Sequence, residues 1–180
     1  MKYLLKTMAT VALCVSGGLA YADTCSMVPG SVTCGSGSVD SLMANGMATL
    51  NGTVIKGSAV INGLLNAEDA RFQSLDVNGS TKLDQCTVSE TAKIKGSLSA
   101  SSTLFESILE VFSGEIHLTN SKVNRGLHIG HTDAKKQTVY LDNFSEIFGN
   151  IVFDDGKGEV ILRGKSKIDG KVIGGQIVHR

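Results

Sequence analysis

One short phrase, an aliphatic residue followed by a polar residue and a glycine, returns along the chain at a nearly constant spacing. Successive glycines lie 16 to 21 residues apart, at Gly46, Gly63, Gly79, Gly96, Gly114, Gly130, Gly149 and Gly170. This period is too long for a β-hairpin and too short for a folded domain. It is typical of stacked repeats, in which each unit buries its apolar face only against its neighbours.

Other positions of the unit also align when the glycines are superimposed. The residue two before the glycine is apolar in every unit but one: Ala44, Ile61, Val77, Ile94, Phe112, His128, Ile147 and Ile168. Positions two and four after the glycine are mostly apolar as far as Leu118, and after Gly130 they become Thr132 and Ala134. Position seven is small in the first five units: Thr53, Ala70, Cys86, Thr103 and Ser121. Apolar positions two apart have the period of a β-strand.

These columns predict an all-β fold, a single-stranded β-solenoid (β-helix) of about eight coils of 16–21 residues. Coils stacked about 4.8 Å apart would place like residues in ladders inside a narrow tube. Glycine and asparagine at the corners supply the left-handed backbone conformations that turn the chain. The columns loosen after Gly130, and the sequence does not fix the register beyond it.

A helix is the competing interpretation of residues 101–114, "SSTLFESILEVFSG". Thr103 and Glu106 have capping-box spacing, and Gly114 would end the helix. However, Phe105 and Phe112 also fall in the solenoid columns. We favour the solenoid, because agreement across many coils outweighs the local preference of one segment.

The N-terminus has the pattern of a cleaved signal peptide over residues 1–22. Lys2 and Lys6 precede an apolar run, and residues 20–22 have the small-x-small form that signal peptidase recognises. The apolar run is shorter than the roughly 20 residues that a transmembrane helix needs. We therefore expect an exported protein, periplasmic or secreted, without a transmembrane segment in the mature chain. It would begin at Asp23 with a Ser/Gly-rich segment, residues 23–43, followed by the solenoid domain, residues 44–180.

The cysteines agree with export. Cys25 and Cys34 lie nine residues apart in the Ser/Gly-rich segment, where a disulfide would order a terminus that has few apolar residues. Cys86 then remains unpaired, and we expect it to act as a small buried apolar residue. Loss of two lysines with the signal leaves 15 basic and 17 acidic residues, a formal charge of −2, which does not favour a nucleic-acid partner.

Few residues suggest chemistry. His128 and His131 are three apart, which on a strand sends them to opposite faces and argues against a metal site. Asp154 and Asp155 precede a glycine, as in an Asp-Gly turn. Among the three sequons, Asn78 belongs to a corner phrase and Asn51 precedes a glycine, so the repeat explains both without a sugar. The sequence shows no nucleotide-binding loop and no assignable triad, so we expect no cofactor, no metal and no enzymatic activity.

The phrases "LNGTVIKGSAVING", "DVNGS" and "AKIKGSLSA", with "RGKSKIDGKVIGG" near the end, resemble the polymer-forming bactofilin domain. That resemblance implies a right-handed β-helix that stacks end to end into filaments without a nucleotide. The signal peptide departs from the family, whose members are typically cytoplasmic.

These features lead to the hypothesis of an exported structural protein that associates with itself through its ends. The last segment carries apolar residues and no obvious cap, so we expect the contact at Val172, Ile173, Ile177 and Val178. The alternative is a secreted binding module whose solenoid face engages a glycan, an envelope component or a host surface.

Overall fold

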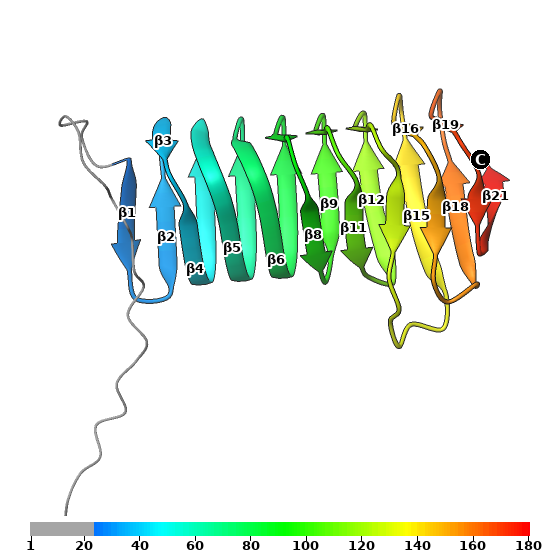
Figure 1. The fold of residues 1–180 in the computed structure, drawn as a ribbon, viewed down its shortest axis with the longest axis horizontal. Coiled ribbons are helices and arrows are strands. Elements are labelled where there is room, and N and C mark those ends of the chain that lie inside the picture. The colour runs from blue at the N-terminus through cyan, green and yellow to red at the C-terminus, as the bar shows by residue number, and fades with distance from the viewer. Residues whose placement is uncertain (1–23) are drawn as a thin grey trace, which may run out of the picture.

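The structure is a computed structural model that describes residues 24–180 as one elongated rod of stacked coils (Figure 1). The predicted signal peptide, residues 1–22, lies outside the described residues. Residues 24–180 contain strands and no helix, and all strands after the first stack in parallel in about nine turns. The predicted β-solenoid is therefore confirmed, and residues 101–114 form strands within it.

Each coil contributes one strand segment to each of three faces. Face A contains β1 (Cys25–Val28), β2 (Ser31–Cys34), the last parts of β4 (Leu42–Asn51), β5 (Thr53–Glu68) and β6 (Arg71–Asp84), then β9 (Leu98–Ser101), β12 (Glu115–Thr119), β15 (Gln137–Asp142), β18 (Gly158–Leu162) and β21 (Gly175–His179). Face B contains β3 (Gly37–Val39), the starts of β5 and β6, then β7 (Thr87–Val88), β10 (Leu104–Phe105), β13 (Lys122–Val123), β16 (Glu146–Phe148) and β19 (Lys167–Asp169). Face C contains the start of β4, the middles of β5 and β6, then β8 (Ala92–Lys95), β11 (Leu109–Phe112), β14 (Leu127–Ile129), β17 (Ile151–Phe153) and β20 (Val172–Ile173).

The core is a set of ladders along the axis, and in the first coils of face A large and small side chains alternate within them. On face A, Ala48 stacks under Leu65, while the neighbouring column places Leu50 under Ala67. All four side chains are buried. A small residue in one column is thus matched by a large residue beside it in the same coil. This keeps the filled volume of successive coils similar and the tube evenly packed.

The corner between faces C and A requires glycine. Gly46, Gly63, Gly79 and Gly96 stack with positive φ, and a Cβ atom on any of them would lie 1.9–2.2 Å from a glycine carbonyl oxygen of the preceding coil. No side chain fits such a contact, and L-residues rarely adopt that backbone conformation. The repeated glycine is therefore set by the stacking distance itself.

The corner between faces A and B uses a different arrangement. One residue per coil has a positive φ near 50–65°: Gly52, Asp69, Gln85, Ser102, Asn120, Asn143 and Gly164. In the first five of these coils a small buried side chain follows directly, and all of them except Ala70 donate to backbone carbonyls. The Ser121 hydroxyl, for example, donates to Thr119 at 2.9 Å and accepts from the Thr103 amide at 3.1 Å. This hydroxyl corner explains why the sequence keeps small residues seven positions after the glycine.

The predicted columns agree with the structure through Gly96, and the first departure is the column two before the glycine at Phe112. Val111, and not Phe112, pairs with Ile94, and Ile129 follows in that column, so Phe112 and His128 lie outside the core column. Residues 130–136, drawn in yellow in Figure 1, then form a loop that displaces Thr132 and Ala134 from the columns. The buried Gln137 amide closes this loop by donating to the carbonyl of Gly130 at 2.8 Å.

The later glycines also belong to a different corner from the one predicted. Ile147, which precedes Gly149 by two, pairs with Val123 on face B. Gly149 and Gly170 therefore stack at the corner between faces B and C. The chain uses the same phrase there because close backbone stacking imposes the same steric limit at that corner.

Candidate functional site

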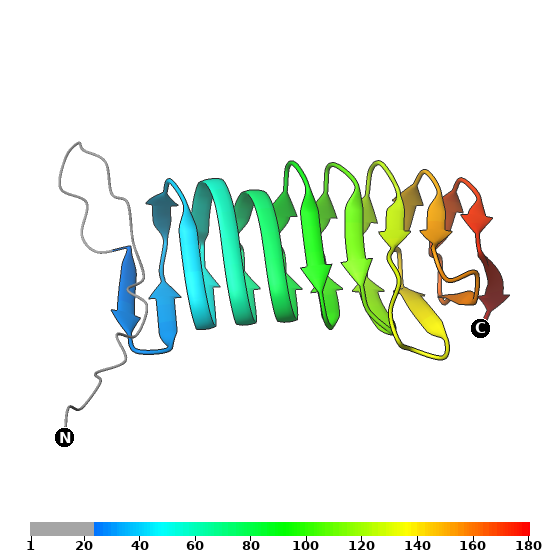
Figure 2. The same ribbon diagram turned by 60° about the horizontal axis from the view of Figure 1, so that its bottom comes forward.

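The first end of the rod is a disulfide-linked hairpin. β1 pairs with β2 in antiparallel fashion, and Cys25 and Cys34 face each other in this pairing and form the predicted disulfide. On its other side β2 joins the parallel stack, through pairing with Met47–Leu50 of β4. The hairpin therefore covers the first coil along face A, at the blue end of the rod in Figure 2. A disulfide is compatible with an oxidising compartment outside the cytosol.

Removal of this disulfide should loosen the first end. A bridge that closes a nine-residue separation contributes about 2–3 kcal/mol by restricting the unfolded chain. We expect Cys25→Ala/Cys34→Ala to lose about this much stability and to speed amide exchange in β1 and β2, while β12 and later strands stay protected. Hydrogen-exchange mass spectrometry with and without a reductant would measure this. Unchanged exchange in β1 after reduction would contradict it.

The other end of the rod has an open coil. β19, β20 and β21 each pair with an earlier strand, and no described strand lies on their far side. The core columns consequently end in partly exposed side chains: Val160 is fully buried, whereas Ile177, the next residue of its column, is 44% exposed.

The four predicted self-association residues divide into two pairs at this end. Val172 and Ile177 continue the inner columns of Ile151 and Val160. Ile173 and Val178 pair with Val152 and Ile161, which alternate with the inner-column residues and lie outside the core cluster, although Ile161 is itself buried. The sequence identified an apolar end but did not distinguish these two directions.

The backbone of β21 also has unpaired groups. The Arg180 amide donates to the carbonyl of Leu162 in β18. This bond shows which amides of β21 point toward β18 and which point away from it. In a parallel ladder, consecutive amides point to opposite neighbours. The amides of Ile177 and His179 therefore point away from β18, toward the open end, where they can donate hydrogen bonds to another strand.

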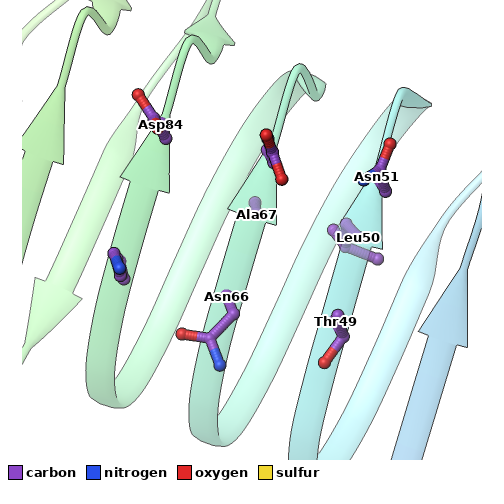
Figure 3. Close-up of a pocket in the computed structure, with 8 residues that line it drawn as sticks. Thr49, Leu50, Asn51, Asn66, Ala67 and Asp84 are labelled. Atoms are coloured by element: carbon purple, nitrogen blue, oxygen red, sulfur yellow. The ribbon is translucent and has the colours of Figure 1, made fainter.

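A shallow polar hollow of about 310 Å³ lies on face A near the first end. In Figure 3, Asn51 and Asp84 stand near the ends of their strands, with Thr49 and Asn66 further from those ends. Glu68 pairs in register with Asp84, and Lys82 completes the lining. Hydroxyl, amide, carboxylate and ammonium groups in one hollow suit a ligand with many hydroxyl groups. No sequence pattern predicted this hollow, because its residues share no type.

The two histidines singled out in the sequence meet the two aspartates. The distance between His128 Nε2 and Asp154 Oδ1 is 2.8 Å, and His131 Nδ1 bonds to Asp155. Asp155 also accepts from the amide of Thr132. These contacts hold the loop of residues 130–136 against the predicted Asp-Gly turn, which is present at residues 154–156.

This contact has a defined pH dependence. The hydrogen bond with Asp155 raises the pKa of His131, and the same bond lowers the pKa of Asp155. The stabilisation from His131 is present below its ordinary pKa of 6.5 and is lost as the pH rises through the raised value. That from Asp155 is present above its ordinary pKa of 3.8 and is lost as the pH falls through the lowered value. The loop is therefore held most firmly at weakly acidic pH.

An NMR titration of the imidazole signals tests this contact. We expect Asp155→Asn to return the pKa of His131 toward 6.5, because the raising hydrogen bond and charge are both lost. Asp133→Asn is the matched control, since Asp133 contributes only a weaker charge effect. An equal change in both variants would contradict the assigned contact.

Other reactive groups in the described chain are few. Cys86 is buried at the hydroxyl corner, as expected for a small apolar residue, and burial raises the pKa of its thiol to about 11. Residues 24–180 contain no group of three or more His, Cys, Asp or Glu side chains arranged to hold a metal ion. None of these residues forms a helix capable of crossing a membrane.

In comparisons with known proteins, no family model, no curated protein and no solved structure matches the chain. The resemblance to bactofilins therefore stays a hypothesis based on the repeat pattern, and the open coil at β19–β21 is the feature from which a function can be argued.

Proposed function

We propose that this protein is an exported structural protein without enzymatic activity, a bactofilin-like β-helix that associates end to end in the cell envelope or outside the cell. The observation that supports the proposal best is the open last coil. A coil on which no described strand is stacked leaves both apolar columns and backbone amides available to another strand layer.

Physical complementarity favours a second copy of the chain as the partner. The last coil presents a parallel strand edge on each of its three faces, at the spacing that the rod itself uses. Another solenoid end offers edges of the same kind, so stacking would bury Val172 and Ile177 and pair the free amides of β21. Burial of an aliphatic side chain contributes up to about 1.5–3 kcal/mol, in proportion to the area it loses to water, so both side chains favour the contact.

The test compares two isoleucines of the last coil that have similar exposure and opposite directions. Ile177 is 44% exposed and ends an inner column, whereas Ile173 is 48% exposed and points outward. We expect the protein purified after export to form larger species as its concentration rises, seen by light scattering and as rods in negative-stain microscopy. Ile177→Lys should keep it monomeric, because a charge then lies at the stacking surface.

Ile173→Lys is the matched control and should still assemble, while deletion of residues 171–180 should abolish assembly. Circular dichroism would establish that each variant keeps its β structure. A protein that stays monomeric at high micromolar concentration would refute end-to-end association. Assembly blocked by Ile173→Lys and not by Ile177→Lys would show a lateral contact instead.

The polar hollow on face A supports a second candidate, a binding module for a hydroxyl-rich glycan. Asn66 and Lys82 both line it and are paired in register on adjacent coils. If this function applies, Asn66→Ala should lower glycan retention in affinity electrophoresis and leave the size distribution unchanged. Assembly and glycan binding thus have separate measurements.

A further inference from the structure

Two phenylalanines lie outside the core on neighbouring parts of one coil. Phe72 and Phe105 fill an inner column and are almost fully buried, but Phe144 is 57% exposed and Phe148 is 40% exposed. Both exposed rings belong to the segment around β16. Ile147 is fully buried, so Phe148 beside it projects outward from face B, and Phe144 lies in the turn that leads into this strand.

Phe144 occupies an extra position at the hydroxyl corner. In earlier coils the small buried residue directly follows the residue with positive φ, as in Asn120-Ser121. In this coil Phe144 stands between Asn143 and Ser145, and the next coil places Lys165 in the same way between Gly164 and Ser166. The Lys165 ammonium lies 5.6 Å from the centroid of the Phe144 ring. The core does not require either residue at this position.

The charges around these rings are mostly positive. Over the last three coils, face B and the corner after it (residues 120–126, 143–150 and 164–171) carry two acidic residues, Glu146 and Asp169, and five basic residues: Lys122, Arg125, Lys165, Lys167 and Lys171. Glu146 is engaged by Lys122 at 2.9 Å and by Lys167 at 3.9 Å. Earlier segments of the same face (residues 36–41, 52–57, 69–73, 85–90 and 102–107) carry two basic and four acidic residues.

We propose that this basic aromatic patch, defined as Phe144, Phe148 and the five surrounding basic residues, docks on an anionic lipid membrane surface. The phenyl rings enter the headgroup region, and the ammonium and guanidinium groups contact lipid phosphates. Two exposed rings four residues apart on a rigid rod can insert without the cost of ordering a flexible segment. Basic residues near an anionic surface add an attraction that salt screens.

The membrane explains this combination better than a soluble polyanion does. A soluble polyanion would contact only the basic residues and would leave the two aromatic side chains in water. A lipid surface contacts both kinds of residue, because the apolar rings enter the boundary between headgroups and acyl chains while the basic groups stay at the phosphates. The proposal concerns a side of the rod and does not depend on contact through its ends.

Vesicle sedimentation with the protein purified after export tests the proposal. We expect binding to phosphatidylcholine vesicles that contain phosphatidylglycerol, and weak binding to phosphatidylcholine alone. Phe144→Ser/Phe148→Ser should lower the partition coefficient at least about tenfold through lost burial of the rings. Lys165→Glu/Lys167→Glu should lower it by about the same factor, and added salt should weaken binding of the unchanged protein.

The chain offers matched controls on other surfaces. Met43 and Met47 are 51% and 43% exposed, and Lys56 and Lys95 are exposed outside the patch. Met43→Ser/Met47→Ser and Lys56→Glu/Lys95→Glu should each change the partition coefficient less than about twofold. The same measurements in an Ile177→Lys background show how much of the vesicle binding belongs to the single protein and how much comes from assembly into multivalent rods.

Three results would overturn the proposal. The first is no binding to the anionic vesicles. The second is an equal loss in the phenylalanine and methionine variants, which would show general adhesion. The third is binding to a soluble polyanion such as heparin that competes with vesicles and is unaffected by Phe144→Ser/Phe148→Ser, which would identify an acidic polymer as the partner.

Discussion

Gly79→Ala is expected to lower the free energy of unfolding by at least about 3 kcal/mol. The added Cβ would lie 1.9 Å from the carbonyl oxygen of Gly63 in the preceding coil, and φ at this position is 149°. The clashing atom belongs to the backbone, so no rotamer change relieves the contact. The coils would have to separate locally, which breaks ladder hydrogen bonds on both sides. Urea denaturation followed by circular dichroism measures the loss.

Two other glycines separate the steric effect from the conformational effect. Gly35 has an ordinary φ and nothing within 4 Å of an added Cβ, so Gly35→Ala should change stability by less than about 0.5 kcal/mol. Gly156 has a φ of 65° and equally open surroundings, so Gly156→Ala should cost about 1 kcal/mol from the backbone alone. If Gly79→Ala costs no more than Gly156→Ala, close stacking is not what fixes glycine at that corner.

The fold could be predicted from the sequence in those coils where two independent constraints occur in every repeat. Coils up to Gly96 require both a glycine at one corner and a small residue at the next, and these requirements keep the columns in register. Beyond that point Val111 and Phe112 are both apolar, so hydrophobicity did not decide which of them enters the column. His128, the one polar member of the predicted column, was the available signal that the register had moved by one residue, because its neighbour Ile129 is the buried one.

Some features left no pattern in the sequence. The residues with positive φ at the hydroxyl corner differ in type, and only the small residue that follows marks their place. The disulfide and the open apolar end could be predicted because they depend on residue types and spacing. The basic aromatic patch could not, since Phe144 and Phe148 resemble core residues until the structure shows them to be exposed.

Phe105→Ala is expected to lower the free energy of unfolding by about 3–5 kcal/mol. Phe105 is 1% exposed and stacks in register between Val88 and Val123. The backbone ladders hold the coils at a fixed spacing, so neither valine can move along the axis to fill the cavity. Poor relaxation around a cavity is the condition under which truncation costs most.

The loss should also be local, because each coil contacts only its neighbours. Amide exchange should rise most in β7, β10 and β13 and least at the two ends of the rod. Phe144→Ala removes the same atoms from a 57% exposed position and should change stability by less than about 0.5 kcal/mol. A uniform rise in exchange along the chain would mean that the rod unfolds as one unit, and that the coils are coupled over more than nearest neighbours.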